Sequence, residues 1–314
     1  MRHKLIYICC TVSLFIGACT GHKSDIIIQE LKKDFEIMSL LDDSIVWQGI
    51  TGMECKKQVL YFSDYENRRI VMYNHKNDSV HTIGKKGEGP GEFIGIHHFW
   101  IENDTFYIVD GLQRAVVIFQ NDNYVGSIKI PDEVNSIFAT RFFYSNSLFY
   151  FPNRRDESII CIDKFSNIKR KIGPIRDEND KGARILFPRE NSFISIGVSV
   201  PVFEEYSMQG ELLRIFDLTQ IPVIQEKINL IKSQPPLDSH SFRTLIKDGG
   251  YADGKTYILC YDYLLSFDMQ QEEITLASIY QLENLFYTQL CIDGNSLYLF
   301  DMKECSIVHY TLDN

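Results

Sequence analysis

Most of the chain repeats a unit of about forty residues, and this repeat constrains the fold more than any other feature. Each unit has an apolar run of strand length, a polar turn, and a second alternating run that ends in an aromatic residue. In the first two units the first run ends at Asp64 and at Asp110, and the aromatic residue follows nine positions later in both. The repeated anchor positions lie at or near residues 64, 110, 153, 197, 260 and 301.

These six units predict an all-β fold, a six-bladed β-propeller of four-stranded antiparallel blades. Each unit offers a short apolar run before its central pair of strands and another after it, which gives four strands per blade. The helical patterns of 10–15 residues that a parallel α/β fold needs are largely absent. The chain ends at the third strand of the sixth unit, so we expect residues 35–40 to supply the missing strand and close the ring.

The first residues read as a targeting signal. Arg2 and Lys4 precede an apolar stretch over residues 5–18, and the string Ile-Gly-Ala-Cys that ends at Cys19 resembles a bacterial lipobox. We expect residues 1–18 to be a lipoprotein signal peptide and Cys19 to be lipidated, which anchors the protein in a membrane. An ordinary cleavable signal with an incidental cysteine is the alternative.

The expected domain organisation follows from this signal and the repeat. Residues 19–34 are a tether, residues 35–314 are the propeller, and residues 217–248 are an insertion between blades 4 and 5. Thr20 differs from the aspartate that retains enterobacterial lipoproteins at the inner membrane. We therefore expect an outer-membrane location in the bacterial cell envelope, with the periplasmic and the surface face both open.

Composition excludes two classes of protein. The formal net charge of −10 lacks the basic footprint of a nucleic-acid-binding protein, so no nucleic-acid partner is expected. The mean hydropathy of −0.14, with one long apolar run, excludes a polytopic membrane protein. Five cysteines remain after the signal and Cys19, and they show no metal-binding spacing. An oxidising compartment would permit disulfides between them, but we expect buried free thiols, namely Cys55, Cys161, Cys260, Cys291 and Cys305.

Two strings in the first units carry a resemblance to a known family. Residues 83–93 read Ile-Gly-Lys-Lys-Gly-Glu-Gly-Pro-Gly-Glu-Phe, and Asp64, Asn67 and Arg69 precede them at fixed spacing. Together they resemble the blade signature of NHL-type propellers. Residues 19–314 as a whole are similar to the six-bladed β-propeller lipoproteins of the Bacteroides group. This resemblance implies the fold and an envelope location, but it implies no reaction and no catalytic residues.

Basic residues gather on one predicted face of the propeller. Turns between the second and third strands share that face with the connections from one blade to the next. Arginine suits bidentate contacts with carboxylates and phosphates, so this face is a candidate site for an anionic ligand. The candidate residues are Arg68, Arg69, Lys85, Lys86, Arg114, Arg154 and Arg155. In the alternative interpretation, arginines such as Arg69 and Arg114 belong to the repeat and brace loops against carboxylates such as Asp64 and Asp110.

The connection after blade 3 adds further basic residues to the same predicted face. These are Arg176, Lys181, Arg184 and Arg189.

Local motifs give little support for other chemistry. The glycine run at residues 84–91 lacks the Lys-Ser/Thr ending of a phosphate-binding loop, and no helix follows it. The histidines show no metal-binding spacing, so no metal and no cofactor are expected. There is no Gly-x-Ser-x-Gly motif, and spacing along the chain cannot show whether two carboxylates face each other across the channel.

The insertion at residues 217–248 is the longest departure from the repeat. Ile224, Ile228 and Ile231 lie on one stripe of a helix over residues 223–232, and Pro235-Pro236 ends it. A second short segment is expected around residues 241–246. Long loops are often lids or binding elements, although a simple cap over the channel is equally consistent with the pattern.

Three functions remain open from the sequence. The first is a non-catalytic envelope module that contacts an envelope protein, a small anionic ligand or a glycan through the loops around the channel. The second is a lyase or hydrolase that acts on an anionic saccharide or peptide. The third is a purely architectural role, since propellers serve all three.

Overall fold

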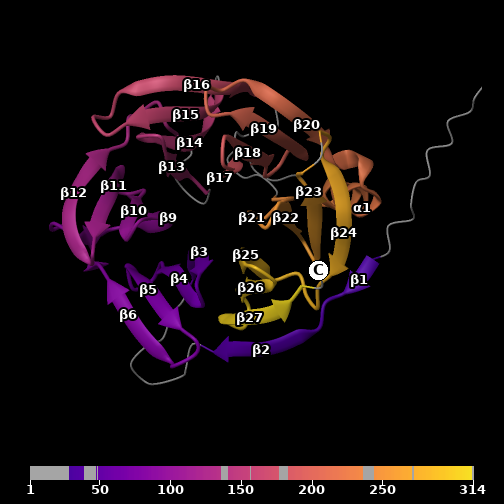
Figure 1. Ribbon diagram of the computed structural model, residues 1–314, viewed down its shortest axis with the longest axis horizontal. Helices are drawn as coiled ribbons and strands as arrows, with labels where there is room; N and C mark the ends of the chain where they lie inside the picture. The colour runs from indigo at the N-terminus through magenta and orange to yellow at the C-terminus, as the bar shows by residue number, and fades with distance from the viewer. Residues whose placement is uncertain are drawn as a thin grey trace, which may run out of the picture.

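The computed structural model describes residues 28–38, 47, 49–135, 141–155, 157–176, 183–235, 244–270 and 272–312. It is a six-bladed β-propeller, as the repeat predicts (Figure 1). The predicted signal peptide, Cys19 and the tether up to residue 27 lie outside the described residues. None of the helices in the described ranges is long and apolar enough to cross a membrane.

Blades 1 to 3 each have four antiparallel strands in sequence order from the channel outward. Blade 1 has β3 (Ile50–Lys56), β4 (Val59–Asp64), β5 (Arg69–Asn74) and β6 (Ser79–Ile83). Blade 2 has β9 (Ile96–Glu102), β10 (Thr105–Asp110), β11 (Ala115–Gln120) and β12 (Asn123–Lys129). Blade 3 has β13 (Phe143–Ser145), β14 (Leu148–Arg155), β15 (Glu157–Asp163) and β16 (Ile168–Pro174).

Blades 4 to 6 follow the same order, and blade 6 is completed from the N-terminus. Blade 4 has β17 (Arg184–Pro188), β18 (Ser192–Gly197), β19 (Val202–Ser207) and β20 (Leu212–Asp217). Blade 5 has β21 (Asp248–Ala252), β22 (Lys255–Cys260), β23 (Tyr263–Asp268) and β24 (Thr275–Gln281). Blade 6 has β25 (Tyr287–Asp293), β26 (Ser296–Asp301), β27 (Ser306–Thr311) and the N-terminal β2 (Lys33–Met38).

The predicted ring closure is confirmed. Strand β2 pairs antiparallel with β27, and the ring of Phe35 stacks on that of His309 at 4.4 Å between centroids. A fifth strand, β1 (Ile28–Glu30), lies parallel to β24 on the rim of blade 5. The predicted tether over residues 19–34 is therefore too long, because β1 and the start of β2 already belong to the sheets and Leu31 is buried between them.

The aspartates at the anchor positions have the same structural role in different blades. Both oxygens of Asp110 accept from backbone N–H groups: Gln113 in the turn that follows, and Ile94 and Gly95 in the connection that leads into the blade. Asp301 likewise accepts from two backbone N–H groups of its own turn and from the side chain of Asn284 in the preceding connection. Each anchor thus ties one turn to one inter-blade connection, and hydrogen bonds of this kind to a buried carboxylate are strong.

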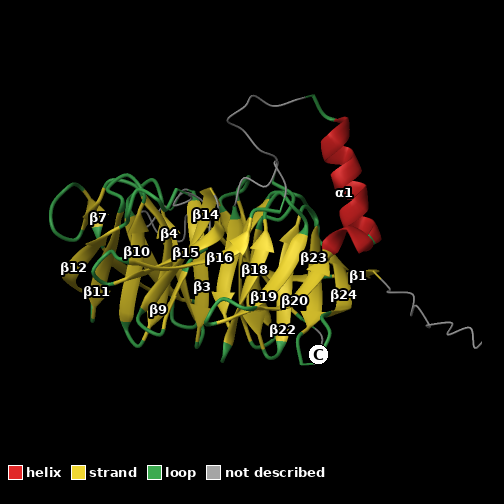
Figure 2. Ribbon diagram, turned by 90° about the horizontal axis from the view of Figure 1, so that it is seen from above, coloured by secondary structure: helices red, strands yellow, loops and turns green. Residues whose placement is uncertain are grey.

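The predicted helix of the insertion is also present. A 3-10 turn over Leu218–Gln220 leads into α1 (Pro222–Ser233), which begins with proline at its first turn. Val223, Ile224 and Lys227 are buried, and Ile228 and Ile231 pack partly against the same cluster of blades 4 and 5. The helix stands up from one face of the ring (Figure 2). Of the second predicted segment, residues 241–243 lie outside the described residues, and Leu245 and Ile246 are buried.

Two features define the faces of the ring. The turns between second and third strands and the connections between blades form one face, which we call the loop face and which carries α1 (Figure 2). The turns between first and second and between third and fourth strands form the opposite face. All five cysteines outside the signal and tether are free thiols in this structure. Three of them are buried as predicted, but Cys55 and Cys305 are partly exposed, so the predicted burial is wrong for these two.

Candidate functional site

The arginines of blade 1 on the loop face are engaged within their own turn. The Nε of Arg69 lies 3.0 Å from Oδ2 of the fully buried Asp64, which also accepts from the side chain of Asn67. Arg68 donates to the carbonyl of Tyr65, and its guanidinium lies 4.2 Å from the centre of the Tyr65 ring. These contacts support the alternative interpretation, in which Arg69 braces the loop.

Arg114 holds the equivalent position in blade 2. It follows the anchor Asp110 by four residues, as Arg68 follows Asp64, and both have a positive φ. Its Nη2 donates to the carbonyls of Pro131 and Val134 at 2.6 and 2.8 Å, and its Nε lies 3.2 Å from Asp132. Arg114 therefore fixes the connection from blade 2 to blade 3.

The lysines of the glycine run lie in a short ladder between β7 (Lys85–Lys86) and β8 (Glu92–Phe93). Lys85 pairs with Glu92 at 3.1 Å, and Glu92 also accepts from the N–H of Gly89. These bonds hold the pKa of Glu92 below its usual range, with the hydrogen bond from Gly89 as the largest cause. Lys86 is exposed. At Gly84, which has a φ of +79°, any side chain would collide with the ring of Phe93, so the glycine shapes the crossing.

The remaining basic candidates are spread over blades 3 and 4. The backbone N–H of Arg154 donates to the side chain of Asn135, and burial lowers the pKa of Arg154. Arg155 ends β14, where it pairs with Glu157 in the backbone ladder. Arg176 pairs with the buried Glu204 of β19.

Two basic residues of the connection after blade 3, Arg184 and Arg189, do not contribute to the loop face as predicted. Arg184 lies within β17 and is fully buried. Arg189 lies on the opposite face, because β17 has already crossed the ring before it, and there it pairs with Glu205. Lys181 lies outside the described residues. The anion-binding role of the seven candidate residues stays a prediction.

The loop face also carries an apolar patch that the sequence analysis missed. In the connection from β24 to β25, Leu285 is 51% exposed and Phe286 is 37% exposed. They adjoin Met302, which is 56% exposed and whose N–H donates to the carbonyl of Phe286. The ammonium of Lys303 lies 5.7 Å from the centre of the Phe286 ring. We call Leu285, Phe286, Met302 and Lys303 the blade 5–6 patch.

A signal for this patch is present in the sequence. Leu285 and Phe286 follow the polar pair Glu283 and Asn284 in a connection between strands, and Met302 directly follows the anchor Asp301, at the start of a turn. Apolar residues in such positions cannot be strand core. Their contact with each other, however, depends on residues from different turns.

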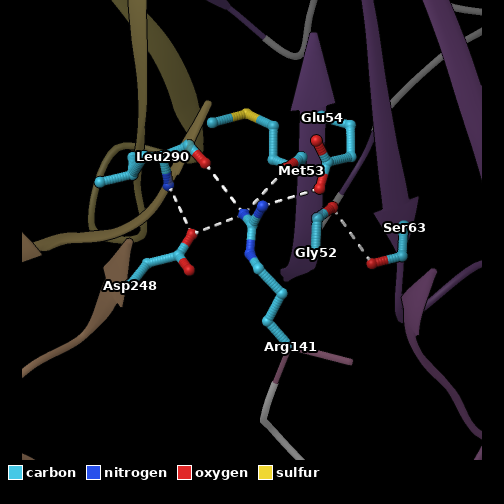
Figure 3. Close-up of polar contacts among 7 residues, drawn as sticks. All are labelled: Gly52, Met53, Glu54, Ser63, Arg141, Asp248 and Leu290. Carbon is cyan, nitrogen blue, oxygen red and sulfur yellow. Dashed lines mark hydrogen bonds and ion pairs between the residues drawn. The ribbon is translucent and has the colours of Figure 1, made fainter. Parts of the chain in front are cut away.

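One buried arginine joins four blades at the centre of the ring. Arg141, just before β13, donates through Nη1 to Oε1 of Glu54 at 2.7 Å and through Nη2 to Oδ2 of Asp248 at 3.1 Å. The same Nη2 lies 3.1 Å from the carbonyls of Met53 and Leu290, so blades 1, 3, 5 and 6 meet at this guanidinium (Figure 3). Asp248 accepts in addition from the N–H of Leu290 at 2.9 Å.

Burial dominates the electrostatics of this cluster. It raises the pKa of the Glu54 and Asp248 carboxyls, and the positive charge of Arg141 opposes that rise. Burial alone would lower the pKa of Arg141, but the charges of Asp248 and Glu54 outweigh it and raise that pKa. The single guanidinium therefore holds two carboxylates that repel each other, so this cluster suits a structural role in the channel.

A neutral histidine lies near this cluster. His98 of β9 is 3% exposed, and burial together with the charge of Arg141 holds its pKa well below the usual value. The inner strand β3 approaches it at Gly52, where a methyl group would come within 2.8 Å of the imidazole. Among the described residues, no group of three His, Cys, Asp or Glu side chains is placed to hold a metal ion.

Comparisons with known proteins identify a family and several structural neighbours. A family described as DUF5128, 6-bladed beta-propeller, matches residues 24–233. No curated protein matches the sequence. A DUF4221 family member from Bacteroides vulgatus has a TM-score of 0.61 at 8% identity, over 90% of this chain and 97% of that one.

Two other solved structures are similar. A Bacteroides fragilis protein described as exported has a TM-score of 0.60 at 11% identity, over 91% of this chain and 99% of that one. Streptogramin B lyase has a TM-score of 0.54 at 8% identity, over 89% of this chain and 97% of that one. At these identities the structural likeness establishes the fold alone.

Proposed function

Because the chain belongs to the DUF5128 family of six-bladed β-propellers, we propose that it is a non-catalytic binding module that contacts a partner protein through its loop face. The observation that carries this proposal is the blade 5–6 patch. Three large apolar side chains are exposed side by side there, on the same face as the projecting helix α1. Exposed apolar groups that gather in one place are typical of protein interaction sites.

The charges around the loop face indicate the chemistry of this partner. Lys303 borders the patch and is about three-fifths exposed, and its pair with the exposed Glu304 at 2.8 Å is a weak surface contact. Lys86 is exposed on the same face at blade 1. The partner should therefore present an apolar segment with acidic side chains beside it. Such a charge arrangement mainly increases the association rate, while the apolar contacts contribute most of the affinity.

The smaller anionic ligand or glycan expected from the sequence finds less support. Arg69, Arg114 and Lys85 each pair with a carboxylate. A small anion would have to displace these internal partners, which costs part of its binding energy. A thermal-shift screen with acidic glycans and phosphorylated metabolites tests this version, with an Arg68, Arg69 and Arg114 triple alanine variant as the control.

The enzymatic alternative would require groups in the channel that are free to act on a substrate. Arg141, Glu54 and Asp248 converge there, but both carboxylates are paired with the guanidinium. The likeness to streptogramin B lyase concerns the fold and transfers no reaction to this chain.

We also propose that the protein is a lipoprotein of the bacterial envelope, at the outer membrane, with Cys19 as the lipidated residue. Its lipobox-like string and the Bacteroides fragilis neighbour described as exported support this location. Eight residues lie between Cys19 and Ile28 of β1, and these nine residue-to-residue steps span at most about 30 Å when fully extended. Membrane fractionation of a Cys19→Ser variant tests the anchor, because that variant should leave the membrane fraction.

An affinity isolation from envelope extracts tests the binding proposal. The wild-type protein is compared with a Leu285→Glu and Met302→Glu double variant of the patch. The matched control is Phe165→Glu, because Phe165 is 72% exposed but lies in a turn on the opposite face. Partners retained by the wild type and by the control, but lost from the patch variant, would support the proposal. The same partners on all three proteins would contradict it.

A further inference from the structure

Two inner strands from the ends of the propeller lie side by side at its centre. Strand β3 opens blade 1 and strand β25 opens blade 6, and both run from the loop face toward the opposite face. One nitrogen of Arg141 donates to the carbonyl of Met53 in β3 and to that of Leu290 in β25, each at 3.1 Å. These two bonds place Met53 of β3 opposite Leu290 of β25 at the channel.

One or two residues after these carbonyls, each strand carries a cysteine. Cys55 follows Met53 by two residues, and Cys291 directly follows Leu290. Their side chains reach the same apolar cluster between blades 1 and 6, and each thiol shifts the pKa of the other. Cys291 is 3% exposed within an apolar cluster that also contains Met53, and Cys55 packs against that cluster while keeping part of its surface exposed.

We propose that Cys55 and Cys291 form a disulfide bond that joins blade 1 to blade 6. The oxidant is a disulfide, carried either by a dithiol oxidase protein or by a small molecule such as oxidised glutathione. Cys55 attacks that disulfide as the thiolate, which forms a mixed disulfide and releases one thiol of the oxidant. Cys291 then attacks the Cys55 sulfur and releases the second thiol. Two cysteine thiols are thus oxidised while one disulfide is reduced to two thiols.

The exposures of the two cysteines set this order of attack. Cys55 retains some solvent contact, whereas Cys291 is enclosed and reaches only its neighbour. Burial raises the pKa of both thiols, so little thiolate is present at neutral pH. Oxidation should therefore be slow at neutral pH and become faster as the pH rises.

The position of this bond gives it a structural role. Strand β2 already joins the ends of the propeller at the rim, through its pairing with β27. A disulfide between β3 and β25 would join the same two blades at the channel. Most of the chain lies between the two cysteines, and a disulfide that closes a long loop restricts the unfolded chain most. In the cell this bond needs an oxidising compartment, and only that part rests on the proposed export.

Controlled oxidation of the purified protein tests the inference. The reduced protein is incubated with oxidised glutathione at several pH values, and the remaining thiols are then blocked with a maleimide after denaturation. Peptide mapping should find Cys55 linked to Cys291, a rate that increases with pH, and a thermal midpoint several degrees above that of the reduced form.

Two variants make the outcome specific. Cys305→Ser is the matched control, because Cys305 is also partly exposed but contacts a backbone carbonyl of its own turn, and it should oxidise like the wild type. Cys55→Ser should form no internal disulfide. If Cys55 and Cys291 both stay blockable, or if Cys55 keeps a glutathione adduct that Cys291 does not displace, the inference is wrong. The wild-type map decides this even if a variant fails to fold.

Discussion

Replacing Arg141 by methionine should destabilise the whole ring. The change removes four polar contacts at once, to Glu54, Asp248 and two backbone carbonyls, and it leaves two carboxylates at the channel without a counterion. Breaking a buried ion pair by removing one partner costs about 3–5 kcal/mol. Since Asp248 is almost fully buried and Arg141 contacts three other blades, we expect Arg141→Met to lose about 3–5 kcal/mol of unfolding free energy.

Denaturant unfolding, followed by circular dichroism, measures this loss. The matched control is Arg170→Met, because Arg170 is half-buried near the rim and donates to one carbonyl, that of Met208. We expect the control to lose about 1 kcal/mol or less.

A second variant shows whether the loss of stability comes from the unpaired carboxylates or from the missing arginine side chain. Adding Glu54→Gln and Asp248→Asn to Arg141→Met removes the uncompensated charges, and this triple variant should regain a large part of the stability. A loss below about 1 kcal/mol in Arg141→Met would refute the reasoning, as would a triple variant no more stable than the single one.

Three further predictions concern the same scaffold. In denaturant unfolding, Gly52→Ala should lose about 1–3 kcal/mol of unfolding free energy, because the new methyl group would press on the imidazole of His98. An unchanged unfolding free energy would show that β3 can move away. The unfolding free energy should fall as the pH drops below about 6.5, because His98 then takes up a proton in the unfolded chain but stays neutral in the folded one. His98 should contribute up to about 1.4 kcal/mol per pH unit to this fall. His98→Phe should flatten the decline, and an unchanged slope would contradict the prediction. A chain that begins at residue 42 lacks β2, and we expect it to associate through the open edge of β27. A chain that begins at residue 32 lacks only β1, and we expect it to elute in size-exclusion chromatography like the chain that keeps β1.

The sequence contains the fold in a local form, which is why the blades could be predicted. The anchor positions and the alternating runs each depend on residues within one unit, and the missing sixth-blade strand followed from counting the strands of the last unit. The role of Asp64 as partner of Arg69 is also local, five positions apart, and the alternative interpretation of the loop arginines rests on this kind of spacing. Strand β1 was missed because three residues with no clear alternation give no strand signal.

The central cluster could not be predicted from the sequence. Arg141 contacts residues 87, 107 and 149 positions away, in three other blades. No local pattern encodes which inner strands will face one another across a ring. The one sequence signal is a charged residue directly before the apolar run of β13, at a position that in a propeller faces the channel.

The binding role predicted for the loop face stays a prediction, but the structure shows internal partners for several of its arginines that the sequence does not reveal. The arginines drew attention because charge is visible in a sequence, whereas their internal partners are visible only in the fold. The blade 5–6 patch has the reverse property, because exposure of Leu285, Phe286 and Met302 depends on how two separate turns meet.

Site-specific photo-crosslinking in living cells tests the central claim most directly. A photoreactive amino acid replaces Met302 on the loop face in one strain and Phe165 on the opposite face in another, since both side chains are well exposed. We predict a discrete crosslinked protein from position 302 that is absent from position 165 and disappears when Leu285→Glu is added. Equal products from both positions, or none from position 302, would contradict the proposal that the loop face binds a partner protein.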